Sequence, residues 1–268
     1  MKSFKDRIPA PIWKVGRSLY FAALHSKLWP AAYLHPWRRK SIQYLRQYKD
    51  IHKGERCFII GNGPSLNKTD VSKLKNEYCF GMNRIYLAFP DWGFETSYFV
   101  SINDLVIEQC AEEITQLKMP KFLAWHSRPH ISLTDEMAFL HTTYTGPKFQ
   151  KDARKRIWEG ATVTNVAMQL AFYMGFEQVI LIGVDHNFKS KGEANKTIVS
   201  QGDDENHFDA KYFGKGFRWQ LPDLDTSEIA YKIACEAYEE AGREILDATI
   251  GGKLQVFKKV DYDSLFNL

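Results

Sequence analysis

The chain has 268 residues, of which 44% are hydrophobic and 25% charged, a balance typical of a globular protein with a sizeable core and not of a disordered or fibrous one. Its net charge of +4 is uneven: residues 1–56 hold 13 Lys/Arg and 3 Asp/Glu, which leaves 23 and 29, a net of −6, for the remainder. Because the body is net negative, we expect no nucleic-acid partner. The four cysteines lie far apart without a C-x-x-C pair, which excludes the usual zinc and disulfide patterns and favours a cytoplasmic protein.

Residues 1–54 are predicted to form a basic amphipathic helical arm. The segment combines its cations with Trp13, Trp29 and Trp37, a composition typical of helices that lie in a membrane interface with anionic headgroups. Its longest weakly polar run, 18–34, is interrupted by Lys27 and Pro30, so it is a poor spanning helix, and no signal-peptide cleavage pattern is present. Two interpretations stay open for residues 1–50. They attach the protein peripherally to the inner face of the cell membrane, or they pack on the chain's own domain or on a second copy in a homo-oligomer.

The rest of the chain, 55–268, alternates strand-like and helix-like runs. Helical spacing of apolar residues predicts helices over 107–117, 163–174 and 226–241, the last with Asp225 and Glu228 as a capping box and Gly242 at its end. This alternation predicts an α/β fold, a Rossmann-like and mostly parallel sheet with helices on both faces. The predicted strands, short and rich in β-branched or aromatic residues, are 56–61, 78–82, 97–102, 121–125, 178–184 and 243–248.

The first strand runs directly into the loop "GNGPSL", residues 61–66. Gly61 and Gly63 allow the backbone to approach a phosphate or ribose closely, and Asn62 and Ser65 offer side-chain hydrogen bonds. Leu66 stands where a third glycine would complete the dinucleotide motif, and no G-K-[ST] follows. On the pattern alone, a nucleotide-binding loop and a structural turn are both open.

Asparagines follow the next two strands. Asn83 comes after the second, and Asn103 after the third. Amide side chains at successive strand ends pair donors with acceptors and can recognise a base or ribose, although each alone is also a common cap or turn residue.

A later helix begins at Thr162 and Thr164, and the strand after it delivers Asp185 and His186 to the same sheet edge. A carboxylate at a strand end binds a hydroxyl or a metal ion, or orients a neighbouring group. Capping of the next turn is the alternative role for Asp185.

The stretch "QGDDENHFDAKYFGKGFRW", 201–219, is long and rich in glycine, which predicts a mobile lid. His207 is the candidate general base, since the ordinary pKa of histidine is near neutrality. Tyr212, Lys215 and Arg218 are the lid residues that could reach a phosphate. A surface position without a catalytic role is the alternative for His207.

These motifs resemble a known group of proteins. "IIGNGPSL", the asparagine after the next strand and the block from Thr162 to Asp185 are similar to bacterial lipooligosaccharide sialyltransferases and the related motility-accessory-factor flagellin glycosylation proteins. "GVDHNF", "NHFDAKYFGKGFRW" and "DATIGGKLQVFKKVDYDSL" are closer to the family named after archaeal 6-hydroxymethylpterin diphosphokinase. The resemblance covers about residues 55–262.

The resemblance implies roles for individual residues. Asn62 and Ser65 would hold the phosphate and ribose region, His207 would be the catalytic base, and Thr162 would match the threonine of the sialyltransferase T-S-G turn. The sialyltransferases carry two tyrosines shortly after the strand-end aspartate, whereas His186 follows it here. Either His186, or Lys215 and Arg218, takes over the role of steadying the departing phosphate, or the chemistry differs from that of the sialyltransferases. Asn83 and Asn103 would contact the nucleotide.

Three functions follow, in order of preference. The first is an inverting glycosyltransferase of surface polysaccharide or glycoconjugate biosynthesis, with a CMP-activated nonulosonate as nucleotide-sugar donor, a glycan or lipid-linked acceptor, and no cofactor or metal. The second is a diphosphokinase that moves pyrophosphate from ATP to a hydroxymethylpterin, with Mg²⁺ held by Asp185 and the acidic residues 203–205. The third is a non-catalytic nucleotide-binding partner in a polysaccharide assembly complex.

Overall fold

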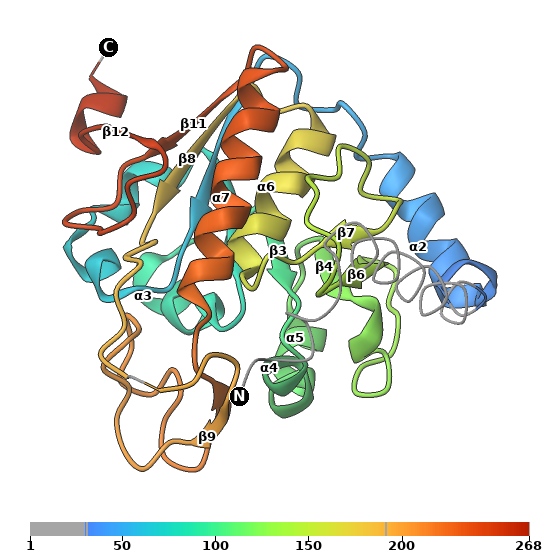
Figure 1. The fold of residues 1–268 in the computed structure, drawn as a ribbon, viewed down its shortest axis with the longest axis horizontal. Coiled ribbons are helices and arrows are strands. Elements are labelled where there is room, and N and C mark those ends of the chain that lie inside the picture. Colours follow the sequence, from blue (N-terminus) through green and yellow to red (C-terminus); the bar gives the residue numbers. More distant parts are fainter. Residues whose placement is uncertain (1–29, 31, 191, 268) are drawn as a thin grey trace, which may run out of the picture.

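The computed structural model describes residues 30, 32–190 and 192–267. Its centre is an eight-stranded sheet in the order β12-β11-β8-β1-β2-β3-β4-β5, with every neighbouring pair parallel. Helices cover both faces (Figure 1), which confirms the predicted α/β, Rossmann-like fold. The strands are β1 (Arg56–Ile60), β2 (Tyr78–Met82), β3 (Tyr98–Ser101), β4 (Lys121–Ala124), β5 (Met137–Leu140), β8 (Gln178–Ile182), β11 (Glu244–Asp247) and β12 (Lys258–Lys259).

The central strands are apolar because both of their faces are covered. Along β1, Cys57 and Ile59 join one hydrophobic cluster, whereas Phe58 and Ile60 join the cluster on the opposite side. All four are fully buried. A strand buried on both faces has no polar alternation, which explains the unbroken run before "GNGPSL".

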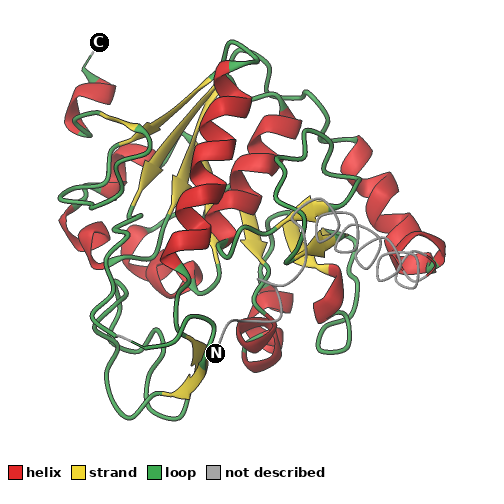
Figure 2. Cartoon of the chain, in the orientation of Figure 1, coloured by secondary structure: helices red, strands yellow, loops and turns green. Residues whose placement is uncertain are grey.

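Two long helices, α6 (Val163–Met174) and α7 (Leu224–Glu239), lie side by side over one face (Figures 1 and 2). Short elements cover the other face. They are η2 (Pro64–Lys68), η3 (Val71–Leu74), η4 (Ile85–Ala88), α3 (Phe89–Trp92), α4 (Asp104–Gln109) and α5 (Ala111–Gln116). The remaining short elements are η5 (Trp125–Ser127), β6 (Thr142–Thr143), β7 (Ile157–Trp158) and η6 (Asp263–Phe266).

Helix boundaries differ from the predictions at two points. The helix expected over 107–117 is two helices, because Cys110 leaves the helical conformation at φ −125°. The capping box of Asp225 and Glu228 is wrong: α7 begins two residues earlier, and the carboxylate of Asp223 accepts from the N–H of Thr226 at 3.0 Å. Gly242 ends the helix as predicted, with φ +70°.

Helix α2 (Pro36–Arg46) lies against the edge strand β5. The hydroxyl of Ser41 accepts from the N–H of Phe139 at 2.9 Å, and Leu45 is fully buried in the core. The described part of the predicted arm therefore packs on the chain's own domain. Residues 1–29 and 31, with Trp13 and Trp29, lie outside the described residues, and membrane attachment stays a prediction.

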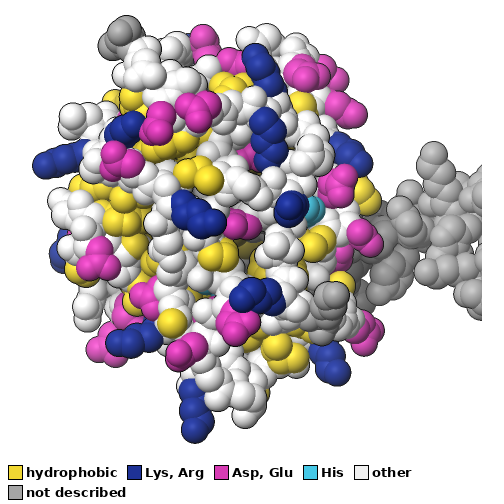
Figure 3. All heavy atoms as spheres, turned by 90° about the vertical axis from the view of Figure 1, so that its left-hand side faces the viewer, with side chains coloured by type: hydrophobic (Ala, Val, Ile, Leu, Met, Phe, Trp, Pro, Cys, Tyr) yellow, Lys and Arg dark blue, Asp and Glu magenta, His cyan; other side chains and the backbone are white. Residues whose placement is uncertain are grey.

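The helix lengths and the surface charge of the described residues bear on the prediction of membrane attachment. Within the described residues, no helix combines the length and the apolar character that crossing a membrane requires. On the face shown in Figure 3, Lys/Arg and Asp/Glu side chains intermingle with hydrophobic ones. That face therefore carries no patch of a single sign.

The predicted lid, 201–219, lies next to regular structure and has a hydrophobic cluster of its own, while its mobility stays a prediction. Strands β9 (Thr197–Val199) and β10 (Arg218–Gln220) pair antiparallel. Tyr212, Phe213 and Trp219 form a small hydrophobic cluster beneath them. The aromatic residues of "HFDAKYFGKGFRW" thus form a small hydrophobic core, which the prediction from the glycine content did not consider.

Candidate functional site

The site lies where the strand order reverses. From β1 the chain proceeds through β2, β3, β4 and β5 in one direction, whereas β8, β11 and β12 lie on the other side. Loops leaving neighbouring strands at such a point diverge and open a crevice. A cavity of about 580 Å³ lies there, bordered by the loops after β1 and β8. Most of the predicted site residues line it: Gly61, Asn62, Gly63, Asn83, Asn103, Thr162, Thr164, Asp185, His186, His207 and Tyr212.

The two glycines of "GNGPSL" are required by packing of one loop on the other. A β-carbon on Gly61 would lie 2.2 Å from the carbonyl oxygen of Gly183, and one on Gly63 would lie 1.9 Å from Oδ2 of Asp185. Both distances are far below van der Waals contact. The sequence predicted that the glycines let the backbone approach a phosphate or ribose. In the structure the absence of a side chain at these positions lets the loop after β8 pack closely on the loop after β1.

Asp185 and Ser65 are bound to each other. The hydroxyl of Ser65 donates to Oδ2 of Asp185 at 2.6 Å, and its backbone N–H donates to Oδ1 at 3.2 Å. Ser65 is buried and does not line the cavity, so the expected contact of its side chain with a nucleotide is not seen. Asp185 borders the cavity with part of its hydrogen-bonding capacity already used.

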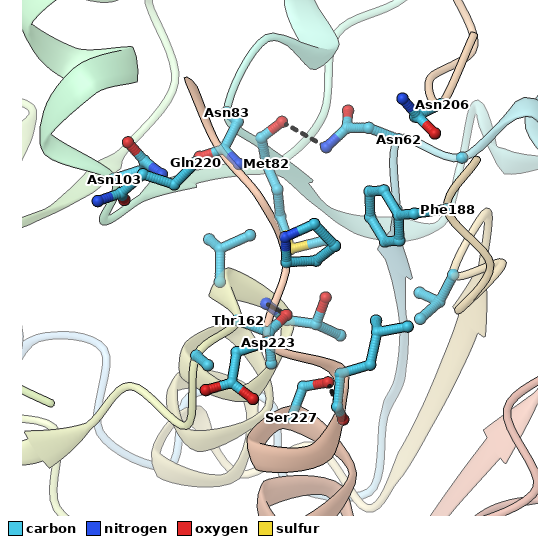
Figure 4. A pocket seen from close by; sticks show the side chains of 18 of the residues that line it. Asn62, Met82, Asn83, Asn103, Thr162, Phe188, Asn206, Gln220, Asp223 and Ser227 are labelled. Carbon is cyan, nitrogen blue, oxygen red and sulfur yellow. Dashed lines mark hydrogen bonds between the residues drawn. The ribbon is translucent and has the colours of Figure 1, made fainter. Parts of the chain in front are cut away.

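The three asparagines occupy one side of the cavity (Figure 4). Asn62 donates to the carbonyl oxygen of Met82 at 3.2 Å, while its own Oδ1 is buried without a partner in the described part of the chain. Asn83 has a left-handed backbone, φ +52°, a conformation that asparagine tolerates better than most residues. Asn103 caps α4 by accepting from two backbone N–H groups. Each asparagine therefore has a structural role and borders the cavity as well.

Helix α6 begins at the cavity wall. Thr162 is its N-cap, accepting from the N–H of Thr164 at 3.2 Å, and its hydroxyl lies 3.4 Å from that of Tyr231. Uncapped N–H groups and the helix dipole of this 12-residue helix favour a negative charge at this end.

His207 is paired with a buried carboxylate. Its Nδ1 lies 2.7 Å from Oδ2 of Asp204, and its ring stacks on Tyr212 with centroids 4.0 Å apart. The Asp204 side chain is only 3% exposed. Burial acts to raise the pKa of Asp204, but hydrogen bonds from His207 and from backbone N–H groups outweigh it and hold that pKa below its ordinary value. An ionised Asp204 fixes the ring and leaves Nε2 for a ligand.

Asp204 was not predicted in this role, since the acidic residues 203–205 were considered as magnesium ligands. The carboxylate instead accepts from His207 and from the N–H groups of Asn206 and Phe213. Asp203 and Glu205 are exposed. No group of three His, Cys, Asp or Glu side chains in the described ranges could hold a metal ion. The D-x-x-H spacing was the sequence signal for the Asp204–His207 pair.

The lid is anchored to the sheet edge. The hydroxyl of Tyr212 accepts from the N–H of Arg84 at 3.3 Å, and the Arg84 guanidinium donates to the carbonyl of Lys211 at 3.0 Å. Lys215 and Arg218 are exposed and do not line the cavity. Arg218 pairs with Glu108 at 2.9 Å. Neither side chain reaches the cavity in this structure, and their contact with a phosphate stays a prediction.

His186 borders the cavity in a left-handed conformation, φ +51°. Burial lowers the pKa of His186; Glu228 opposes this effect and Lys259 adds to it. A lowered pKa favours the neutral ring, and the expected role of His186 at a phosphate stays a prediction.

A second charged cluster at the cavity was not predicted. His126 lies between two carboxylates, with Nδ1 2.7 Å from Asp104 and Nε2 3.0 Å from Glu159. Burial acts to lower the pKa of His126, but the two hydrogen-bonded carboxylates outweigh it and raise that pKa to about 9. The three residues come from the start of α4, from η5 and from the turn after β7, so no spacing in the sequence identifies them.

The model of a family described as 6-hydroxymethylpterin diphosphokinase MptE-like matches residues 34–191, more than half of the 268 residues. The chain belongs to this family. The match includes "GNGPSL", the three asparagines, the start of α6 and the strand-end Asp185, and it stops before His207. The predicted resemblance is therefore confirmed at the level of the family.

Two further comparisons were made. No curated protein matches the chain. Among solved structures, a MAf glycosyltransferase from Magnetospirillum magneticum AMB-1 aligns at 15% identity with a TM-score of 0.49, over 91% of this chain and 42% of that one. The chain thus spans less than half the length of that protein.

Proposed function

We propose that the protein is a glycosyltransferase of surface polysaccharide or glycoconjugate biosynthesis that uses a nucleotide-activated sugar. The observation that carries the proposal is the Asp204–His207 pair at the wall of a cavity into which the start of α6 also opens. A base held by a carboxylate, together with an anion-favouring helix end, is what transfer of a sugar from a nucleotide to a hydroxyl needs.

The reaction follows from these two groups. Nε2 of His207 takes the proton of an acceptor hydroxyl, whose oxygen bonds to the anomeric carbon while the bond from that carbon to the phosphate oxygen breaks. Asp204 stabilises the imidazolium that forms. The negative charge on the departing nucleotide lies near the N–H groups at the start of α6. A single displacement of this kind inverts the anomeric configuration.

A CMP-activated nonulosonate is the proposed donor. A cytosine presents an exocyclic amino group beside acceptor atoms. The amide side chain of Asn62 belongs to a residue that lines the cavity, and an amide pairs a donor with an acceptor in the same way. Asn83 and Asn103 border the same cavity and would contact the nucleotide as the sequence predicts.

A lipid-linked acceptor at the inner face of the cell membrane is part of the proposal. Helix α2 packs its buried side on β5 and exposes Arg39, Lys40 and Arg46 on the other. Cations on an exposed helix face are attracted to anionic headgroups, which supports peripheral attachment.

The family description favours a second candidate, transfer of pyrophosphate to a hydroxymethylpterin. That reaction draws on Mg²⁺ to bridge the phosphates of ATP, and the oxygens of Asp185 and Asp204 already accept hydrogen bonds from within the chain. A metal site would require these bonds to be exchanged for metal contacts.

Thermal-shift measurements on the full chain with CTP, CMP, UDP, GDP and ATP, each with and without Mg²⁺, separate the candidates. Stabilisation by cytidine nucleotides without metal is the expected result. Stabilisation by ATP alone, and only with Mg²⁺, would replace the transferase with the diphosphokinase. Stabilisation by a nucleotide in a protein that transfers neither sugar nor pyrophosphate would favour the non-catalytic assembly partner.

A further inference from the structure

One part of the cavity wall lies near the segments that follow β3, β4, β6 and β7, and we call it the Tyr144 end. It consists of Tyr144 and Glu159, which line the cavity, and of His126 and Asp104 behind them. We propose that the Tyr144 end binds a sugar ring through the face of Tyr144 and the carboxylate of Glu159. The inference rests on the proposed function for placing a sugar in this cavity.

Tyr144 is a largely exposed aromatic residue that lines the cavity. It is the most exposed of the large hydrophobic residues that the structure describes, at 68%, and the centroid of its ring lies 5.7 Å from that of His126. Its carbonyl oxygen is held by the indole N–H of Trp158 at 3.3 Å. A fixed backbone that presents a largely exposed ring to a cavity is suited to binding an apolar surface. The C–H face of a sugar ring is such a surface.

The carboxylate of Glu159 is the group that would accept hydrogen bonds from the hydroxyl groups of the sugar. Its side chain is 4% exposed, and Oε1 is fixed by His126 at 3.0 Å, whereas no hydrogen bond to Oε2 is found within the described ranges. A carboxylate only accepts hydrogen bonds and has room for several, so the hydroxyl groups of a sugar are matching donors. Such bonds to an ionised acceptor are stronger than those between neutral groups.

His126 makes this carboxylate a rigid acceptor. The imidazolium joins Glu159 to Asp104, and Asp104 also accepts from the hydroxyl of Ser127. The cluster of two carboxylates and one imidazolium carries a net charge of −1. It therefore favours the hydroxyl groups of a sugar over a phosphate group.

The ring could belong to the donor or to the acceptor, since both present the same chemistry. Calorimetry on the full chain with CMP and with CMP-N-acetylneuraminic acid measures what the donor sugar adds to the affinity. Saturation-transfer NMR with a panel of methyl glycosides, with and without CMP, measures binding of an acceptor ring. Each is performed on the wild type, Tyr144→Ala, Tyr144→Phe and Glu159→Gln, with Tyr78→Ala as a control for loss of an exposed tyrosine at the start of β2.

We expect Tyr144→Ala to leave CMP binding unchanged and to weaken one of the two sugar measurements, the donor-sugar affinity or the glycoside binding, about tenfold. Glu159→Gln should weaken the same measurement at least threefold. Tyr144→Phe and Tyr78→Ala should stay within threefold of the wild type in both. Loss in the donor arm or loss in the glycoside arm each supports the Tyr144 end as a sugar site. Unchanged binding in both arms for Tyr144→Ala overturns it, as does a wild type that binds no glycoside and gains no affinity from the donor sugar. If no nucleotide binds the wild type, the proposed function fails; a glycoside signal that Tyr144→Ala abolishes would still support the sugar site.

Discussion

Nδ1 of His207 lies 2.7 Å from Oδ2 of Asp204, a carboxylate that is almost fully buried. This pair defines the tautomer of the ring, because a carboxylate only accepts and Nδ1 must therefore carry the proton. Nε2 is then the basic atom.

Replacing His207 by alanine is expected to lower the rate of sugar transfer by about 10²–10⁴, the usual contribution of a general base. Nucleotide binding is expected to stay within threefold of the wild type, since the ring contacts Asp204 and Tyr212 and not the start of α6. Steady-state kinetics and thermal shift with CMP measure the two effects. Transfer at the wild-type rate would remove His207 as the base.

Asp204→Asn is expected to reduce the rate by at least tenfold, because the neutral amide no longer stabilises the imidazolium. The pKa of Asp204 is below its ordinary value in the folded protein. Its contribution to the free energy of unfolding is therefore present above the unfolded pKa and is lost as pH falls through the folded one. Unfolding in urea from pH 7 to pH 3 measures it: the gap between wild type and Asp204→Asn should narrow at the acid end, and a constant gap would contradict the pairing.

His126→Gln tests the second cluster by the opposite pH dependence. The folded pKa of about 9 lies above the ordinary value of 6.5, so the stabilisation is complete below pH 6.5 and is lost as pH rises through 9. The difference in unfolding free energy between wild type and variant should shrink between pH 6.5 and 10. A difference that grows over this range would show that His126 is not protonated between Asp104 and Glu159.

Gly63→Ala is expected to destabilise the protein by about 2 kcal/mol or more, in the range of overpacked buried sites. Its new β-carbon would meet Oδ2 of Asp185 at 1.9 Å. Gly202→Ala is the matched control, because nothing lies within 4 Å of its added carbon. Equal melting temperatures for the two variants would refute the contact between the loops after β1 and β8.

Leu45→Ala asks whether α2 belongs to the folded domain. Leu45 is fully buried whereas Leu34 is 60% exposed, so truncation should cost about 2–5 kcal/mol at Leu45 and under 0.5 kcal/mol at Leu34. Chemical denaturation of both variants measures the costs. Similar small losses would indicate that α2 is a detachable arm.

Much of the fold could be predicted from the chain alone. Short apolar runs bounded by polar residues, such as 57–60, favour strands covered on both faces, and the small residues Ala167 and Ala171 suit a helix packed closely on a sheet. The boundaries of α7 were less predictable, because Asp223, Asp225 and Glu228 all have capping chemistry and only the path of the preceding loop selects Asp223.

The candidate site divides in the same way. Residues at strand ends, such as Asn62, Asn83 and Asp185, were predictable because parallel strands bring their carboxyl ends to one edge. Ser65 was expected at the ligand, but its hydroxyl turns to Asp185. Lys215 and Arg218 were expected there as well, but neither lines the cavity, and Arg218 pairs with Glu108.

The sequence by itself determined the parallel α/β sheet, its strand-end loops and the polar side chains those loops present, because periodicity and local chemistry act over a few residues. Only the tertiary structure decided which of those side chains meet a ligand, which meet one another, and that His126 lies between Asp104 and Glu159. Such pairings depend on loops that are distant in the chain and adjacent in space, and their distances exist only once the sheet has assembled.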